Sequence, residues 1–293
     1  MKRFRIASLL VVATAVIAGA WPAGAFAASP PNLGTALNFT VLAGSTITNT
    51  GPTVITGDLG LSPGSAVTGF PPGVVTGVKH VTDAPALQAQ NDLVTGYNDA
   101  ANATSTSDKT GVNLGGLDLV PGVYTFSSSA QLTGALTLSG NGLYIFQIGS
   151  TLTTASGSSV LLNNGAQACG VYWQVGSSAT LGAATQFQGN LMALTSITMV
   201  TGANILTGRA LARNGALTLD TNQITPPSGP CNLAPAPTPT PTASATPTTS
   251  GVGLPVAGGI AHQPGLPWLP LALAATIGAL LLGLRVRTGR RKS

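Results

Sequence analysis

The sequence predicts a mainly β fold in which short strands stack coil upon coil, with one α-helix beside them. Segment 50–57 has a near copy at 201–208: both read Thr-Gly-x-(Thr/Asn), then two apolar residues and Thr-Gly. Such a repeat is typical of folds that present the same short side chains from separate turns. Three further segments place a threonine between two apolar residues, centred on Thr180, Thr198 and Thr218. Their spacing of about twenty residues fits coils of three short strands with variable corners.

The first 27 residues have the pattern of a secretory signal peptide. Lys2, Arg3 and Arg5 precede the apolar run 6–18, and the Ala-Phe-Ala sequence at 25–27 provides a cleavage site. The apolar run is too short for a membrane helix, and it ends in small residues. We therefore expect an exported protein from which this segment has been removed.

Residues 28–231 are the predicted β-helical domain. From Leu37 to Val81, short apolar runs alternate with Gly, Pro and Asn, which is the pattern of short strands between turns. The strand pattern returns between Leu114 and Ile224. The contiguous apolar run 143–148 indicates a strand that is buried on both faces.

One stretch, at about residues 84–103, has helical periodicity. Thr82 or Asp83 can cap its start, and Pro85 suits the first turn of a helix. Apolar residues then recur on one helical face, at Leu87, Val94, Tyr97 and Ala101. The sequence therefore predicts a single helix that packs beside the coils.

Two cysteines, Cys169 and Cys231, are present. Oxidising surroundings outside the cell favour a disulfide between them. This bond would tie the middle of the domain to its C-terminal end. Two free, buried thiols are the alternative.

The C-terminal part of the chain has the layout of a surface anchor. Residues 232–253 are rich in Pro, Thr, Ser and Ala and predict an extended stalk. Residues 254–258, Leu-Pro-Val-Ala-Gly, resemble a sortase sorting signal, with Ala257 where threonine is usual. Residues 266–286 predict a transmembrane span, and the basic residues in 287–293 predict a cytoplasmic tail. The expected partners are a sortase and the cell wall, or the membrane alone if the signal is not cleaved.

Charge and composition exclude several functions. Away from the two basic ends, only Lys79, Lys109, Arg209 and Arg213 balance seven aspartates, and glutamate is absent. This acidic domain has no basic patch, so we expect no nucleic-acid partner. Neither histidine has a metal-ligand set nearby in the sequence, and no phosphate-binding loop or nucleophile elbow is present. We expect no metal, no cofactor and no enzymatic activity. Asp220, close in sequence to Arg213, is expected to cap a turn or a strand end.

The domain resembles a large family of microbial ice-binding proteins over about residues 33–226. The resemblance is carried by Phe-Thr-Val-Leu-Ala-Gly at 39–44, Ile-Thr-Gly-Asp-Leu-Gly at 55–60, Leu-Val-Pro-Gly-Val-Tyr at 119–124, Tyr-Ile-Phe-Gln-Ile at 144–148, Val-Tyr-Trp-Gln-Val-Gly-Ser-Ser-Ala at 171–179 and Gly-Arg-Ala-Leu-Ala at 208–212. It implies a discontinuous right-handed three-sided β-helix with one long α-helix packed alongside. It also implies that the N-terminal and C-terminal segments are neighbours in space.

The resemblance further implies an ice-binding face. Family members bind ice through a flat face with Thr-(Ala/Gly)-x-(Thr/Asn) segments, and the matching positions here are Thr50, Thr53, Thr185, Thr201 and Asn204. Further candidates for the same face are Thr154, Thr180, Thr198, Thr218 and Thr221. Coils that stack about 4.8 Å apart would turn these positions into a ladder. Threonine is stiff at χ1 and carries a methyl and a hydroxyl, so the ladder is pre-organised to order water.

Two other functions stay open at this point. One is a non-enzymatic adhesive or structural surface protein, and the other is a polysaccharide-binding or polysaccharide-cleaving β-helix. Sugar sites usually show exposed aromatic residues and carboxylates, but aromatic residues make up only 5% of this chain. The expected function is adsorption to an ice crystal surface by a monomer, which inhibits ice growth or recrystallisation or tethers the cell to ice.

Overall fold

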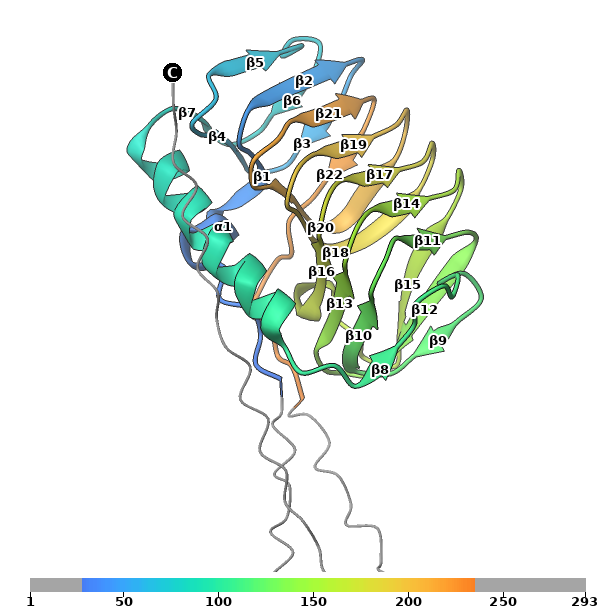
Figure 1. Cartoon of the computed structure of the whole chain (residues 1–293). Coiled ribbons are helices and arrows are strands. Elements are labelled where there is room, and N and C mark those ends of the chain that lie inside the picture. The colour runs from blue at the N-terminus through green and yellow to red at the C-terminus, as the bar shows by residue number, and fades with distance from the viewer. Residues whose placement is uncertain (1–27, 235–293) are drawn as a thin grey trace, which may run out of the picture. The chain divides into compact units, whose positions relative to one another are not determined.

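The computed structural model describes residues 28–234, which form a three-sided stack of parallel strands beside one helix (Figure 1). The predicted signal peptide, sorting signal, transmembrane span and tail lie outside these residues, as does the stalk beyond Ala234. Within the described range no helix is long and apolar enough to cross a membrane.

One side of the stack is a seven-stranded sheet in which every strand is short and all pairs are parallel. In these strands the side chains alternate between the interior and the outside, as the period of two requires. In spatial order the strands are β11 (Ala130–Leu132), β14 (Leu152–Thr154), β17 (Ala179–Leu181), β19 (Ile197–Met199), β21 (Leu217–Asp220), β2 (Thr46–Thr50) and β5 (Ala66–Thr68).

The other two sides belong to one fifteen-stranded sheet. The helix-covered side contains β8 (Ser107–Asp108), β10 (Gly122–Phe126), β13 (Tyr144–Ile148), β16 (Val171–Val175), the ends of β18 (Gln186–Ala193) and β20 (Asn204–Ala212), β1 (Phe39–Ala43), β4 (Asp58–Leu61) and β7 (Lys79–Val81). The third side contains β9 (Asp118–Leu119), β12 (Ala135–Ser139), β15 (Ser159–Asn163), the starts of β18 and β20, β22 (Gln223–Ile224), β3 (Val54–Ile55) and β6 (Val74–Val75).

Two stacked glycines allow β18 and β20 to bend from one side to the next. Gly189 pairs with Gly208, and Gly189 has a φ of +102°, which L side chains rarely adopt. A Cβ on Gly208 would lie 1.9 Å from the Gly189 carbonyl oxygen. No other residue type fits this corner, because the neighbouring coil leaves no space for a side chain.

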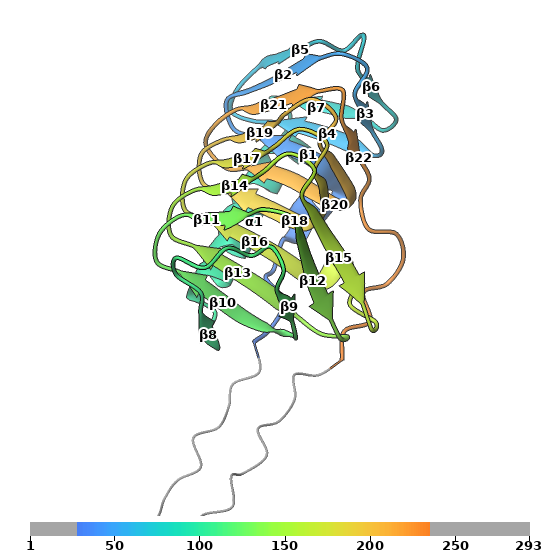
Figure 2. The same ribbon diagram turned by 90° about the vertical axis from the view of Figure 1, so that its right-hand side faces the viewer.

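The order of the coils in space differs from their order in the chain. The first coil stacks on the last one: Thr48 of β2 pairs with Thr218 of β21, and Val41 of β1 pairs with Ala210 of β20. After β7, the helix runs along the stack to β8 at the opposite end, and the chain then returns coil by coil (Figures 1 and 2). The prediction that the two terminal segments are neighbours is confirmed.

The helix α1 (Ala84–Asn102) begins and ends close to the predicted positions. The carboxylate of Asp83 accepts a hydrogen bond from the Ala86 N–H at 3.0 Å, so Asp83 is the cap. The predicted apolar face is wrong in part, because Leu87 is 53% exposed and Ala101 is exposed. The buried positions are Ala86, Ala89, Gln90, Leu93, Gly96, Tyr97 and Ala100. The small residues among them let the helix lie close to its neighbours: a Cβ on Gly96 would be 2.7 Å from a Leu33 methyl.

The domain has two hydrophobic cores. The larger one fills the coils and includes a stack of aromatic rings in which Phe146 and Trp173 are 3.9 Å apart and Tyr124 and Phe187 lie on either side. The smaller core lies between the helix and the helix-covered side. β13 contributes to both cores and is buried along its whole length, as predicted.

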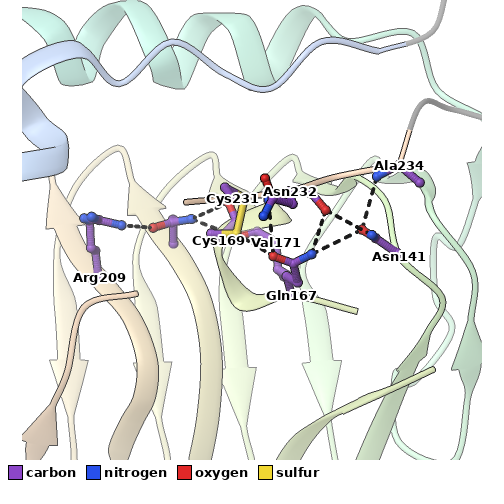
Figure 3. Close-up of a disulfide and its surroundings, with 9 residues drawn as sticks. Asn141, Gln167, Cys169, Val171, Arg209, Cys231, Asn232 and Ala234 are labelled. Carbon is purple, nitrogen blue, oxygen red and sulfur yellow. Dashed lines mark hydrogen bonds between the residues drawn. A yellow bond between two sulfur atoms is a disulfide. The ribbon is translucent and has the colours of Figure 1, made fainter. Parts of the chain in front are cut away.

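The predicted disulfide between Cys169 and Cys231 is present (Figure 3). Beside it, the Gln167 side chain donates to the Asn232 carbonyl at 2.7 Å and accepts from the Asn232 N–H at 3.4 Å. The Asn141 side chain donates to the same carbonyl at 3.0 Å. We name these five residues the C-terminal clamp, because together they hold the last described segment against the coils.

The clamp lies at one vertex of the three-sided stack. Cys169 is in η2 (Ala168–Gly170), which connects β15 on the third side with β16 on the helix-covered side. A vertex between two sides is opposite the remaining side. The chain therefore leaves the described domain at the vertex opposite the seven-stranded sheet.

Candidate functional site

A column of threonines runs across the outside of the seven-stranded sheet. In this register Thr153 pairs with Thr180, Thr180 with Thr198, and Thr198 with Thr218. Thr218 then pairs with Thr48, and Thr48 with Thr68. We name these six residues on six successive strands the threonine column: Thr153, Thr180, Thr198, Thr218, Thr48 and Thr68. Gln131 and then Asn113 continue the column at one end.

The threonine column is available to solvent. Four of its side chains are exposed, and those of Thr180 and Thr198 are partly exposed. Among residues 28–234, no protein group hydrogen-bonds to any of the six hydroxyls. Asp220 is the one charged residue in the seven strands, and it lies at the end of β21. The sheet therefore presents a regular, nearly neutral surface of methyl and hydroxyl groups.

The strands beneath the column hold its side chains in place. The residue before each threonine points inward: it is buried before five of them, as Ala179, Ile197 and Leu217 show, and Val67 before Thr68 is partly buried. Neighbouring parallel strands repeat at about 4.8 Å, and threonine has restricted χ1 rotamers. A column built this way is rigid and periodic before any ligand is bound.

The repeat that identified the fold lies at a corner, beside the threonine column. Ile55 and Ile205 both pair with Ile224, whereas the sequence alignment of the two copies places Val54 opposite Ile205. The copies are thus one residue out of register in space. The register between β18 and β20 shifts after Phe187, where β20 contains an extra residue. The extra residue in this bulge accounts for the offset of one residue between the two copies.

The corner buries three of the ten candidate ice-binding residues. Thr53 and Thr185 have no exposed surface, and Thr154 is 2% exposed. The hydroxyls of Thr154 and Thr185 lie 2.8 Å apart, and the Thr53 hydroxyl accepts from the Asn222 N–H at 3.1 Å. The assignment of these three to the outer face is wrong, because their side chains point inward and satisfy polar groups at the turn.

The other candidates lie in two places. Thr180, Thr198 and Thr218 belong to the threonine column. Around the corner that joins the seven-stranded sheet to the third side, Thr50, Thr201 and Thr221 are exposed and Asn204 is partly exposed. The Asn204 side-chain oxygen accepts from the Gln223 N–H at 2.7 Å, so this amide also braces the next coil.

Sequence reasoning missed half of the threonine column. Thr48, Thr68 and Thr153 were not predicted, although an apolar residue precedes each of them. The pattern was broken because Asn49 follows Thr48 and Thr154 follows Thr153, where an apolar residue was expected. Both polar residues are buried and act inside the corner. A search for apolar-Thr alone, without the third position, would have found them.

Hydroxyl groups surround Asp220 at the corner. The Thr201 hydroxyl donates to its carboxylate, and the Thr221 hydroxyl does so at 3.0 Å. These bonds, first from Thr201 and then from Thr221, hold the pKa of Asp220 below its ordinary value. Thr50 pairs with Asp220 across the strands. We name these four residues the corner cluster: Thr50, Thr201, Asp220 and Thr221.

Arg213 and His80 serve the fold. Arg213 does not pair with Asp220: its guanidinium lies over the Tyr97 ring at 4.8 Å. The His80 imidazole contacts the Asp83 carboxylate at 2.7 Å beside the helix start. Within residues 28–234 no three His, Cys, Asp or Glu side chains gather in a way that could hold a metal ion.

Comparisons with known proteins agree with this geometry. The ice-binding-like protein family matches residues 41–225. An ice-binding protein from Nostoc sp. strain HG1 is 60% identical over 203 residues, which are 68% of this chain and 75% of the relative. One from Flavobacterium frigoris is 35% identical over 212 residues, 67% of this chain and 76% of the relative.

Solved structures give the same result. An ice-binding protein from an Antarctic biological consortium superposes with a TM-score of 0.66 at 50% identity, covering 68% of this chain and 92% of that one. An ice-binding protein from the ascomycete Antarctomyces psychrotrophicus has a TM-score of 0.66 at 41% identity, covering 69% and 100%.

Proposed function

The chain belongs to the ice-binding protein family, and we propose that it adsorbs to ice through the outer face of the seven-stranded sheet. The threonine column is the observation that carries this assignment. Its six side chains are in register, open to solvent and free of hydrogen bonds to protein groups in the described residues. Ice is a repetitive lattice of water, and a repetitive row of methyls and hydroxyls can hold water in a matching arrangement.

The rigidity of the sheet supports the proposal energetically. Each contact with ice is weak, so binding requires many contacts at a small entropic cost. The strands fix the backbone, and the β-branched side chains have few rotamers to lose. Bound molecules then force the ice between them to grow as a curved front, which is unfavourable. A non-enzymatic adhesive scaffold is the less favoured alternative, because it would not need this regular surface.

Ice activity of the purified protein tests the proposal directly. We expect thermal hysteresis, faceted ice crystals and slower recrystallisation at micromolar concentration, with the protein migrating as a monomer in size-exclusion chromatography. A protein that neither shapes ice nor slows recrystallisation would rule out the assignment and leave the adhesive scaffold.

The protein is further proposed to act outside the cell, tethered to its surface. The basic start, apolar run and Ala-Phe-Ala site at 25–27 support export, and the disulfide is consistent with an oxidising compartment. The stalk at 232–253, the Leu-Pro-Val-Ala-Gly sequence at 254–258 and the apolar stretch 266–286 support anchoring. The C-terminal clamp suits such a tether, because the chain leaves at the vertex opposite the threonine column.

Cell fractionation distinguishes the two modes of anchoring. A C-terminal epitope on the full chain should remain in the membrane in both cases. If a sortase cleaves at 254–258, the domain itself should appear in the cell-wall fraction without the epitope. If it does not, domain and epitope should stay together in the membrane. Recovery of the domain inside the cytoplasm would contradict export.

A further inference from the structure

The corner cluster lies where the first coil of the chain stacks on the last one. Asp220 is opposite Thr50 on one side, and on its other side its carbonyl accepts from the Gly202 N–H at 3.0 Å. The two copies of the sequence repeat, which begin at Thr50 and Thr201, therefore flank Asp220. This place is at the edge of the surface to which ice binding is assigned.

Chemistry fixes the direction of the hydrogen bonds in the cluster. An ionised carboxylate only accepts, and a hydroxyl has a single proton to donate. Thr201 and Thr221 therefore each give their proton to Asp220. Their remaining lone pairs are left for water outside. The hydroxyls of the threonine column have no protein partner among the described residues and are free to rotate.

The first coil closes tightly over this arrangement. Gly51 has a φ of +74°, and a Cβ there would lie 2.3 Å from the Thr221 hydroxyl and 3.2 Å from a carboxylate oxygen of Asp220. The backbone at Gly51 therefore lies directly against the Thr221 hydroxyl and the Asp220 carboxylate, with no space for a side chain. The hydroxyls are held in one orientation by the carboxylate and by the packing of the two coils.

We propose that Asp220 is a positioning residue that fixes the hydroxyls of Thr201 and Thr221 as acceptors toward ice. The inference rests on the proposed ice-binding function and extends it. A hydroxyl that is already oriented loses no rotational freedom when it binds a lattice water, so its contact costs less entropy than that of a free rotor. The two donated hydrogen bonds also satisfy oxygens of the carboxylate that would otherwise bind water, and such hydration would disturb an ice-like layer.

The surroundings of Asp220 allow its role to be read from a pH profile. β19 and β2, which pack on either side of β21, contain no titratable residue, and neither do β22, β3 or the corner segments 50–53 and 200–204. Because the pKa of Asp220 lies below its ordinary value, the carboxylate keeps its role from neutral pH down into acid. That role should be lost only as the pH falls through this lowered pKa.

Three variants of the full chain test the inference. In Asp220→Asn the side chain stays nearly isosteric but no longer accepts from both hydroxyls. In Thr201→Val the shape is kept and one oriented hydroxyl is removed. Asp118→Asn is the matched control, because Asp118 is an exposed aspartate on β9, away from the seven-stranded sheet. Binding is measured as partition of labelled protein into growing ice from pH 7 down to about pH 2, within reach of aspartate pKa values.

Both variants of the corner cluster should bind ice about fivefold more weakly at neutral pH, the effect of one net hydrogen bond. The control should match the parent. In acid, the parent should lose the same factor in a step that Asp220→Asn lacks. A variant that served only the fold would lower the melting temperature and show no such difference in pH profile.

Each remaining outcome is also informative. If the parent does not partition into ice at any pH, the proposed function fails, and the inference fails with it. If the parent binds and both variants bind equally well with the same pH profile, the inference alone is overturned. If Asp220→Asn is unfolded, Thr201→Val decides, since it leaves the carboxylate and the other hydrogen bonds of the corner in place.

Discussion

The seven-stranded sheet and the helix-covered side use the same parallel ladder, but they differ in their outward residues. Both sides point one row of apolar residues into the coils. The outward row of the seven-stranded sheet is the threonine column. On the helix-covered side the outward residues include Leu42, Val123, Ile145, Tyr172, Met192 and Leu211, which pack beneath the helix. The identity of every second residue thus decides whether a side is covered by protein or left for a ligand.

The polar groups of the two sides are also used differently. On the helix-covered side, the Gln147 amide donates to the Ala100 and Ala103 carbonyls at the end of the helix, at 2.9 and 2.6 Å. The Gln174 amide donates to the Tyr97 hydroxyl at 2.7 Å, and that hydroxyl donates to the Val175 carbonyl at 3.0 Å. These groups fasten the helix. Among residues 28–234, the hydroxyls of the threonine column make no hydrogen bond to a protein group. Substitutions should therefore separate stability from ice binding.

The largest expected effect is at the C-terminal clamp, which borders the helix-covered side. Replacing both cysteines, Cys169→Ser with Cys231→Ser, removes a cross-link across 62 residues. We expect a loss of about 4 kcal/mol in the free energy of unfolding, from the added freedom of the unfolded chain. Urea denaturation measures it. Ice binding per folded molecule should remain, because the clamp is at the vertex opposite the seven-stranded sheet. A loss of ice binding in protein that is still folded would contradict the separation of stability from ice binding.

The second largest effect is expected from shortening a side chain that is buried beneath the helix. Leu211 is a residue of β20, and its side chain is fully buried beneath the helix. Leu211→Ala should destabilise the fold by about 3 kcal/mol through lost burial and a residual cavity. Thermal or chemical unfolding gives the value, and ice partition at 0 °C gives the activity. Equal losses of stability and of ice binding per folded molecule would mean that the helix-covered side and the seven-stranded sheet are not independent.

A bulky group in the threonine column should weaken ice binding and leave the stability of the fold nearly unchanged. Thr198→Tyr places a ring in the middle of the column, where Thr180 and Thr218 are its neighbours. Because flatness is lost at the centre, affinity for ice should fall at least about tenfold, equivalent to about 1.4 kcal/mol. The melting temperature should hardly change.

The matched control for this substitution is Thr95→Tyr, on the exposed side of the helix. It makes the same chemical change far from the seven-stranded sheet. Ice partition of both variants is compared at equal concentration. If Thr198→Tyr bound ice as well as Thr95→Tyr, the column would not be the ice-binding surface.

The smallest expected effect comes from testing the methyl and the hydroxyl of one threonine separately. Thr198→Val keeps the methyl and the shape, and Thr198→Ser keeps the hydroxyl but frees χ1. We expect Thr198→Val to lower ice affinity by about a factor of two to five, within the value of one hydrogen bond. Thr198→Ser should cost more if rigidity and the methyl dominate. Ice partition with replicate crystals can rank the two variants.

Much of this architecture was determined by the sequence alone. Local patterns predicted the short strands, the start of α1 just after a cap at Thr82 or Asp83, and the buried strand at 143–148, because period and capping are properties of a few neighbouring residues. The disulfide followed from two cysteines in a chain whose first residues have the pattern of an export signal. The threonines at 180, 198 and 218 followed from their apolar neighbours on both sides.

Only the tertiary structure decided which threonines face outward at the corners. Because β20 contains one extra residue, Thr53 and Thr185 stack with the buried Ala203 and face inward, although alignment of the sequence segments places them with Asn204. Thr48 and Thr68 join the column because the first coil stacks on the last one, a pairing between distant segments, and the second coil stacks on the first. The physical reason is that a strand exposes alternate residues, so a single bulge or a distant partner reverses what a motif can predict.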